Sequence, residues 1–242
     1  MTLDAEHLQS PAALAALAAL AVACGALVVA LLRARRRIRD LALTDKLTAL
    51  GTRKLMERDL PREIASARRE GHFLFVAVAD VDRLEPYNHA FGRPAGHALL
   101  AGIGAVLRGA FRRPGDHVFR SGGDQFTFAF STEHRFDGPF MAERVRARVE
   151  ELDRRHTANV PWERVTVSIG LVRIAPGAVA RLDEVEARAL EALALARKEG
   201  RNRVAGLDID GERFQTRDGI ALAPRPAASP AASGAPAGRS DP

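Results

Sequence analysis

Two carboxylates stand where the sequence could bind a divalent metal together with a phosphate group. Asp80 ends the apolar run 73–79, and Asp124 follows Gly122 and Gly123 in a turn. A carboxylate at the end of a strand and another in an adjacent hairpin can share one ion, and Mg²⁺ prefers hard oxygen ligands supplemented by substrate phosphates. Paired glycines let the backbone approach a phosphate closely, because no Cβ intervenes. The turn taken alone is equally compatible with a plain hairpin that carries a solvated aspartate.

The elements that must position these carboxylates alternate between strands and helices. Continuous apolar runs predict buried strands, and apolar residues at helical spacing predict helices packed on them. Thr44 and Asp45 are expected to cap the first helix after residue 43, and Gly200 to end the last one. Such an alternation predicts an α/β sheet with helices packed against it. The predicted strands cover residues 73–79, 117–120, 126–130 and 165–172, and the predicted helices cover 47–69, 95–111, 138–155 and 184–199.

A series of motifs in a fixed order makes this interpretation more specific. They are TDKLTALGTR at 44–53, DVDRL at 80–84, Asn88, Gly92, Gly96, RSGGDQF at 120–126, VTVSIG at 165–170 and GRNRV at 200–204. Together they resemble the GGDEF domain of diguanylate cyclases, over residues 42–205. The resemblance implies a palm-like α/β fold related to the class III nucleotide cyclases, with a mostly antiparallel central sheet flanked by helices. In that family two subunits each bring one GTP and Mg²⁺, and each 3′ hydroxyl attacks the partner's α-phosphate to give cyclic di-GMP.

The resemblance also implies roles for individual residues. Asp80 and Asp124 would be the catalytic carboxylates, and the same two side chains would bind Mg²⁺ together with the backbone of Val81. The nucleotide itself would be bound by Asn88, Gly122 and Gly123. Mg²⁺ is therefore expected only if this site still binds GTP.

Several departures fall at positions that the family uses for chemistry. Gln125 stands where the family has Glu, and an amide cannot serve as a carboxylate base or an anionic ligand. Glu85 replaces a phosphate-facing Lys and would repel a triphosphate. His97 replaces the Asp that accepts guanine N–H groups, and an imidazole offers no two-oxygen fork. Together these losses predict that GTP turnover is lost or very weak. Further departures are Arg93 for His, His89 for Asp, Ala194 for Tyr and Arg197 for Lys.

A second motif precedes the glycine turn. Arg113-Pro-Gly-Asp116 stands where members of the family often carry an RxxD inhibitory motif, which binds an intercalated cyclic di-GMP dimer. An Arg can donate a fork to a phosphate or to guanine O6 and N7, and an Asp can accept from guanine N1–H and N2–H. Arg144 or Arg146 is expected to supply a second arginine. The alternative is a charged surface turn, because an RxxD pair is common by chance.

An uncharged run rich in Ala, Leu and Val precedes these motifs. Residues 11–32 are long enough to cross a bilayer as a helix, at about 1.5 Å of rise per residue. Five arginines follow within 33–39, whereas Asp4 and Glu6 lie on the other side. This asymmetry predicts an uncleaved single-pass anchor in a bacterial inner membrane, with the C-terminal domain in the cytoplasm. The lone Cys24 lies inside the run, which excludes a disulfide framework.

These features divide the chain into five expected parts. They are an extracytoplasmic N-terminus at 1–10, a transmembrane helix at 11–32, a basic juxtamembrane helix at 33–43, a degenerate GGDEF domain at 44–206, and a C-terminal extension at 207–242. The extension is an Ala/Pro/Ser/Gly run without periodicity, and disorder is expected from about residue 221.

The sequence thus predicts a membrane-anchored, catalytically inactive receptor that binds cyclic di-GMP. One alternative is a weak or atypical diguanylate cyclase, and another is a scaffold that binds no nucleotide. A homodimer and an unidentified cytoplasmic protein are the other expected partners. The net charge is +6, but much of the excess is local to residues 33–39, so nucleic acid is not an expected partner.

Overall fold

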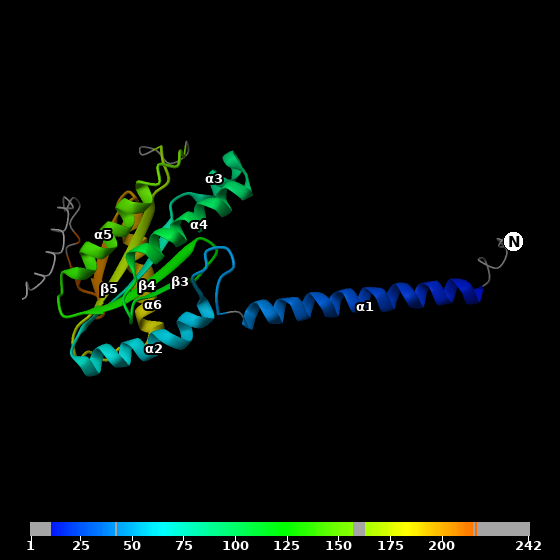
Figure 1. The fold of residues 1–242 in the computed structure, drawn as a ribbon, viewed down its shortest axis with the longest axis horizontal. Helices are drawn as coiled ribbons and strands as arrows, with labels where there is room; N and C mark the ends of the chain where they lie inside the picture. The colour runs from blue at the N-terminus through cyan, green and yellow to red at the C-terminus, as the bar shows by residue number, and fades with distance from the viewer. Residues whose placement is uncertain (1–10, 42, 157–162, 215, 217–242) are drawn as a thin grey trace, which may run out of the picture.

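The protein is described by a computed structural model that covers residues 11–41, 43–156, 163–214 and 216. A seven-stranded mixed sheet carries helices on both faces, and the long helix α1 extends away from this body (Figure 1). The strands lie in the order β1-β3-β4-β2-β5-β6-β7. The helices are α1 (Pro11–Leu41), α2 (Arg53–Glu70), α3 (Leu84–Phe91), α4 (Arg93–Ala110), α5 (Asp137–Glu150) and α6 (Leu182–Lys198). The strands are β1 (Gly51–Thr52), β2 (Phe73–Val81), β3 (His117–Arg120), β4 (Gln125–Thr132), β5 (Val167–Ile174), β6 (Val204–Asp208) and β7 (Arg213–Phe214).

The sheet is antiparallel at its centre and parallel in two places. β2 pairs antiparallel with β4 on one side and with β5 on the other. β3 and β4 form a hairpin around the glycine turn. The parallel pairs are β1 with β3 and β5 with β6. The α/β class and the flanked, mostly antiparallel sheet predicted from the sequence are therefore confirmed.

The central strand β2 determines which residues face which layer of helices. Successive side chains of a strand point to opposite faces of the sheet. The odd-numbered residues from Phe75 to Val81 pack in one cluster, and the even-numbered residues from Leu74 to Val78 pack in the other. Asp80 is the next even-numbered residue and therefore faces the second layer.

Each face of the sheet is covered by its own helices. The first cluster contains the buried apolar side chains of α3, α4 and α5, and the second contains those of α2 and α6 (Figure 1). Burial of apolar surface stabilises a fold by about 25 cal/mol per Å². These two apolar layers therefore hold β2, and the chemistry at its end, in a fixed position.

The start of α2 differs from the prediction. The helix begins at Arg53 after Thr52, and not at residue 47 after a cap at Thr44 or Asp45. The Asp45 carboxylate instead accepts hydrogen bonds from the Thr48 backbone N–H at 2.8 Å and from its hydroxyl at 2.7 Å. An Asp side chain that bonds its neighbouring backbone in this way favours a turn over a helix. Asp45 consequently closes a loop that lies before the helix.

The segment after β2 also differs from the prediction. A separate short helix, α3, precedes α4, and Gly92 between them has φ 83°. This left-handed backbone is accessible to glycine without strain and interrupts the helix. Sequence periodicity alone did not predict α3, nor the short strands β1, β6 and β7.

The N-terminal helix α1 exposes apolar side chains along its described part, including Leu20, Leu27 and Leu31. Among the residues that the structure describes, no helix combines the length and the hydropathy needed to cross a membrane. The transmembrane helix expected at 11–32 is therefore not supported. The run is rich in Ala, whose small side chain contributes little transfer free energy. The expected N-terminus at 1–10 and most of the extension at 207–242 lie outside the described residues.

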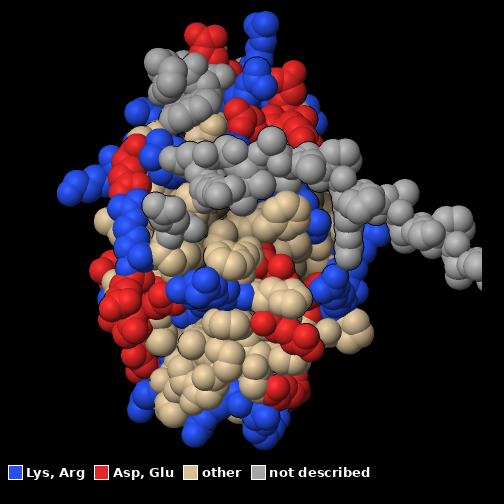
Figure 2. Space-filling view, turned by 90° about the vertical axis from the view of Figure 1, so that its left-hand side faces the viewer, with Lys and Arg blue, Asp and Glu red and all other residues tan. Residues whose placement is uncertain are grey.

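The surface of the body mixes charges of both signs. Figure 2 shows Lys and Arg interspersed with Asp and Glu around the edges of one face, with uncharged residues between them. The described residues on that face form no continuous basic stripe of the kind that tracks a nucleic-acid backbone.

Candidate functional site

Strand pairing brings the two expected metal-binding carboxylates to one end of the sheet. Asp80 of β2 lies opposite Gln125 of β4, and Asp124 immediately precedes that strand. Asp80, Val81 and Asp124 line a shallow cavity of about 270 Å³, together with Arg197 and Arg201. The sequence therefore placed these groups correctly at one site, but it did not indicate which charges contact one another there.

The Asp80 carboxylate is paired with a cation of the chain itself. Its Oδ1 atom contacts Nη2 of Arg197, in the last turn of α6. The Asp80 side chain is only 5% exposed, whereas that of Arg197 is 40% exposed. Burial raises the pKa of the Asp80 carboxyl above its usual value, although the hydrogen bond and charge of Arg197 act in the opposite direction. The guanidinium therefore lies between a buried carboxylate and the open cavity.

These residues do not fit a Mg²⁺ ion. Mg²⁺ requires oxygen ligands in near-octahedral geometry. Asp80 already bonds a guanidinium, and Gln125 contributes a neutral amide where a carboxylate would add charge. Within the described residues, no group of three or more His, Cys, Asp and Glu side chains is arranged to hold a metal. We assign no catalytic step through a metal at this site.

A buried carboxylate beside the site has a structural role that the sequence did not reveal. Asp82 is 2% exposed and accepts hydrogen bonds from the hydroxyls of Thr166 and Ser168, each at 2.7 Å. Its Oδ2 atom also accepts the backbone N–H of Asn202 at 3.2 Å. Asp82 thus ties the end of β2 to the loop that carries Arg201. A buried charge with several donors is satisfied without a metal ion.

A neighbouring cavity of about 490 Å³ is lined by two of the three residues expected to bind a nucleotide, Asn88 and Gly123, but not by Gly122. It is lined by Leu84, Glu85, Asn88, His89, Arg93, Gly123 and Asp124. Glu85 lies 3.9 Å from His89, one helical turn away on α3, and both side chains are more than four-fifths exposed. His97 is exposed on α4 and does not line this cavity. Glu85 therefore stands in the wall of this cavity, and the repulsion of a phosphate expected from its charge stays a prediction.

The packing around Asn88 depends on a glycine. A Cβ atom at position 96 would overlap the Asn88 side-chain oxygen. That oxygen is buried and has no hydrogen-bond partner within the described residues. Asn88 therefore keeps an unused hydrogen-bond acceptor, which costs free energy of folding.

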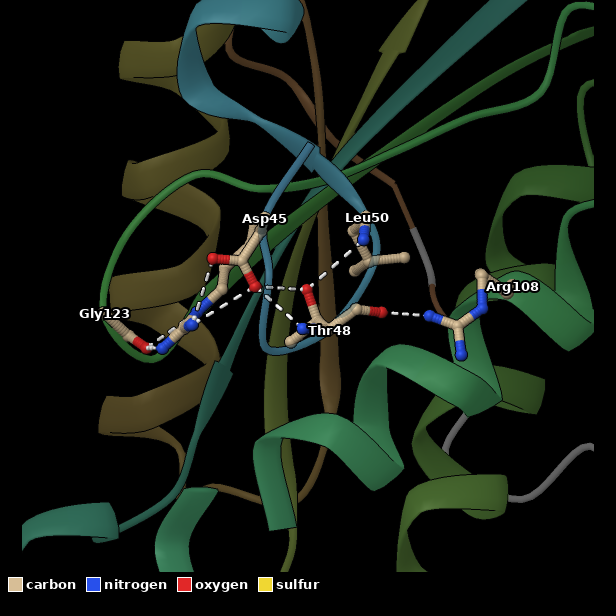
Figure 3. A network of polar contacts seen from close by, with 6 residues as sticks. Asp45, Thr48, Leu50, Arg108 and Gly123 are labelled. Carbon is tan, nitrogen blue, oxygen red and sulfur yellow. Dashed lines mark hydrogen bonds and ion pairs between the residues drawn. The ribbon is translucent and has the colours of Figure 1, made fainter. Parts of the chain in front are cut away.

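Residues outside the glycine turn hold it in place through a network of polar contacts (Figure 3). Arg120 donates to the backbone carbonyl of Gly123 at 2.6 Å and lies 3.3 Å from the Asp45 carboxylate. Burial acts to raise the pKa of Asp45, but bonds from Thr48 and the Arg120 charge outweigh it and lower that pKa. Arg108 donates to the Thr48 carbonyl from α4. The loop before α2 and the turn at Gly122 and Gly123 are thereby joined.

The RxxD motif forms a closed turn with its charged groups at the surface. The Asp116 carboxylate accepts the backbone N–H of Arg113 at 2.9 Å, and the Asp116 N–H donates to the Arg113 carbonyl at 3.0 Å. These two bonds fix the turn before any ligand binds. Arg113 and Asp116 line a cavity of about 420 Å³, and Arg144 of α5 lines the same cavity. Sequence-distant residues with complementary chemistry are thus brought together.

The two candidates for a second arginine lie in different surroundings. Arg144 lines the RxxD cavity, and one of its nitrogens donates to the Ala110 carbonyl at 3.3 Å. Arg146 instead bonds Glu143 and Glu150 and the side chain of Asn202, and it does not line that cavity. The helical offset of two residues places the two side chains on different faces of α5.

Other residues of this cavity carried no signal in the sequence. Its wall includes apolar side chains of β4 and α5 and a polar pair in which the Thr132 hydroxyl donates to Asp137 at 2.6 Å. The β4 residues reach the RxxD turn through the β3–β4 hairpin, and the α5 residues reach it because α5 packs beside α4, which sequence periodicity does not specify. The remaining lining residues are Gly109, Ala110, Arg112, Phe130, Phe140 and Met141.

Comparison with known proteins places these features in a family. The family model described as "Diguanylate cyclase, GGDEF domain" matches residues 42–203. Diguanylate cyclase DosC of Escherichia coli (strain K12) is 34% identical over 161 residues, which cover 66% of this chain and 34% of that protein. The chain therefore spans about a third of the length of this curated relative.

Solved structures show the same fold. The coiled coil and GGDEF domain of DgcB from Caulobacter crescentus, in complex with c-di-GMP, aligns with a TM-score of 0.61 and 29% identity, and covers 78% of this chain and 98% of that one. Diguanylate cyclase SiaD from Pseudomonas aeruginosa, in complex with its activator SiaC, aligns with a TM-score of 0.58 and 25% identity, over 81% and 72% of the two chains.

Proposed function

The chain belongs to the GGDEF domain family of diguanylate cyclases, and from this membership we propose that it is a cyclic di-GMP receptor with little or no cyclase activity. One observation carries the proposal: the structure gathers Arg113, Asp116 and Arg144 around one open cavity. The end of β2, by contrast, has its buried carboxylate paired with Arg197. These two arrangements support ligand binding over turnover as the function of the chain.

The chemistry of the cavity suits a guanine nucleotide with a phosphate backbone. Arginine guanidinium groups donate bidentate hydrogen bonds to phosphate oxygens or to guanine O6 and N7. A carboxylate such as Asp116 accepts from guanine N1–H and N2–H. Apolar side chains of Phe140 and Met141 complete the wall. Cyclic di-GMP carries all of these partners in one molecule, and the DgcB structure contains it.

The experiment that tests this function is calorimetric titration of cyclic di-GMP into the full chain. We expect micromolar or tighter binding that is weakened at least about tenfold in Arg113→Ala and weakened less in Arg144→Ala. Arg148→Ala is the matched control, because Arg148 lies on the same helix, is 66% exposed and lies 3.7 Å from the similarly exposed Glu151. No heat of binding with the unaltered chain would refute the receptor function.

Residual cyclase activity is the second candidate function. Asp80 and Asp124 are both retained at one end of the sheet, and relatives of the chain are named diguanylate cyclases. This function requires that purified protein form cyclic di-GMP from GTP and Mg²⁺, and that Asp124→Ala abolish the product. If the product forms equally in the variant, it comes from a contaminant.

The proposal also covers the partners of this chain and its location in the cell. A ligand-bound receptor can act through a second copy of the chain or through a cytoplasmic protein, and the relative SiaD was solved with a protein activator. Cross-linking of the full chain with and without cyclic di-GMP distinguishes the two. The location at a bacterial inner membrane stays a prediction, which cell fractionation tests.

A further inference from the structure

We propose that the guanidinium of Arg197 acts as a built-in cation that occupies the position of a divalent metal at the end of β2 and keeps metal ions away from Asp80. The cavity at the end of β2 is separate from the RxxD cavity, so this role of Arg197 does not depend on cyclic di-GMP binding. Three features support it: the contact between Arg197 and Asp80, the charges around that contact, and the anchoring of α6.

The charges at this end of the sheet favour a cation. Three carboxylates gather here, namely those of Asp80, Asp82 and Asp124. Asp82 is satisfied internally by two hydroxyls and one backbone N–H. Asp80 is nearly buried and faces Arg197, so that carboxylate is balanced by the guanidinium. Asp80 and Asp124 line the same cavity. Without Arg197, two cations would remain in its wall, Arg201 and the exposed Arg83.

The type of cation matters as much as its charge. A guanidinium stays protonated at every physiological pH and presents a rigid planar fork of donors to a carboxylate. A lysine ammonium is a flexible point charge that moves away from a carboxylate more readily. An arginine at position 197 therefore holds Asp80 in a pair that a divalent ion must break before it can bind.

The backbone keeps Arg197 in place. It belongs to the last turn of α6, whose residues Leu193 and Ala196 are buried against the sheet. The N–H of Arg201 donates to the Ala196 carbonyl at 3.0 Å, and the following residue, Asn202, is bonded to Asp82. The helix end and the loop after it are thus tied to the same strand end that carries Asp80. The guanidinium is presented by a fixed scaffold and is not a chance surface contact.

The test measures Mn²⁺ binding to the full chain in the absence of nucleotide, from the electron paramagnetic resonance signal of free Mn²⁺. Arg197→Ala removes the internal cation. Arg201→Ala is the matched control, because Arg201 lines the same cavity and carries the same charge without bonding Asp80 in the structure. The double variant Arg197→Ala/Asp80→Asn removes the carboxylate that the ion would use. Circular dichroism and the melting temperature show that each variant is folded.

The expected result is Mn²⁺ binding that is equally weak in the unaltered chain and in Arg201→Ala. Binding should be at least about tenfold tighter in Arg197→Ala, because a unit charge next to the ligand has gone. The gain should disappear again in the double variant. Equal Mn²⁺ binding by the unaltered chain and Arg197→Ala overturns the proposal, whether that binding is strong or absent. An equal gain in Arg201→Ala overturns it as well, because the effect would then be one of net charge.

Discussion

The two charged sites of this domain differ in where their charges find partners. At the end of β2, Asp80 is paired with Arg197 and Asp82 with Thr166, Ser168 and Asn202. In the RxxD cavity, the charged groups of the motif lie on a turn that backbone bonds already fix. Both sites line cavities, but Asp80 is bonded by the guanidinium of Arg197, whereas Asp116 is bonded by the backbone N–H of Arg113 and not by its guanidinium.

The comparison shows why substitutions in a signature must be placed in space. Gln125 is conspicuous in the sequence, but its strand still pairs with β2 and places Gln125 opposite Asp80. Arg197 is inconspicuous, because it replaces one cation by another, yet it contacts the buried Asp80. The greater change in chemistry therefore lies at the less obvious position.

The largest expected effect is a gain of cyclase activity at the end of β2, which would make that site functional like the RxxD cavity. We expect Glu85→Lys, His97→Asp, Gln125→Glu and Arg197→Lys together to raise Mg²⁺-dependent formation of cyclic di-GMP by at least about 100-fold, the scale of one restored acid–base group. Gln125→Glu alone should leave turnover unchanged, because Asp80 stays paired. A chromatographic assay of product from GTP measures both variants. Full activity from the single change would contradict this account of the site.

The next effect sharpens the comparison by using ligand affinity. Arg113→Ala should weaken cyclic di-GMP binding by roughly 10- to 150-fold, since a hydrogen bond to a charged group contributes about 1.5–3 kcal/mol. Asp80→Asn should leave the affinity unchanged, because Asp80 lies at the other site. Calorimetry on both variants makes the comparison directly. An equal loss in Asp80→Asn would mean that the two sites are not independent.

A smaller effect is expected at Asp82, which belongs to the site at the end of β2. Asp82→Asn keeps the shape of the side chain but replaces one accepting oxygen by a donor. We expect a loss of about 1–2 kcal/mol in the free energy of unfolding, measured by urea titration, with no change in cyclic di-GMP affinity per folded molecule. Glu133→Gln is a suitable control for this carboxylate-to-amide change, because Glu133 is 77% exposed and lies 3.9 Å from His72. A loss of similar size in the control would remove any special role for Asp82.

The smallest effect concerns the network that joins the loop before α2 to the glycine turn. Asp45→Asn should cost up to about 1 kcal/mol at neutral pH, as expected for a partly exposed ion pair. Because the folded-state pKa of Asp45 is lowered, its stabilisation is present above the unfolded pKa and is lost as pH falls through the folded value. The difference between the two proteins should therefore shrink below about pH 4. Urea titrations across this range measure it, and a constant difference would contradict the assignment.

Much of this architecture could be predicted from the sequence, for identifiable physical reasons. The nine-residue strand β2 is a continuous apolar run, and a buried central strand requires such a run. The β3–β4 hairpin has its glycines where the turn occurs. The placement of Asp80 and Asp124 in one cavity required only that two strand ends meet. These are local sequence signals, and the tertiary structure agrees with them.

The remainder depended on contacts that no local pattern encodes. Thr44 and Asp45 have the residue types of a helix cap, but Asp45 found closer partners in Thr48 and Arg120. The choice between Arg144 and Arg146 depended on which face of α5 meets α4 and which meets the loop at Asn202. Sequence spacing gives the helix, but the packing of neighbouring elements decides what each face touches.

The Asp45–Arg120 network has a consequence for how the domain opens locally. Asp45 bonds both to Thr48 in its own loop and to Arg120, which in turn bonds Gly123 in the turn (Figure 3). Neither segment can detach without breaking contacts of the other, so their opening free energies are shared. We therefore expect the entry loop and the glycine turn to open as one cooperative unit, with their amide hydrogens exchanging with solvent in a single concerted event.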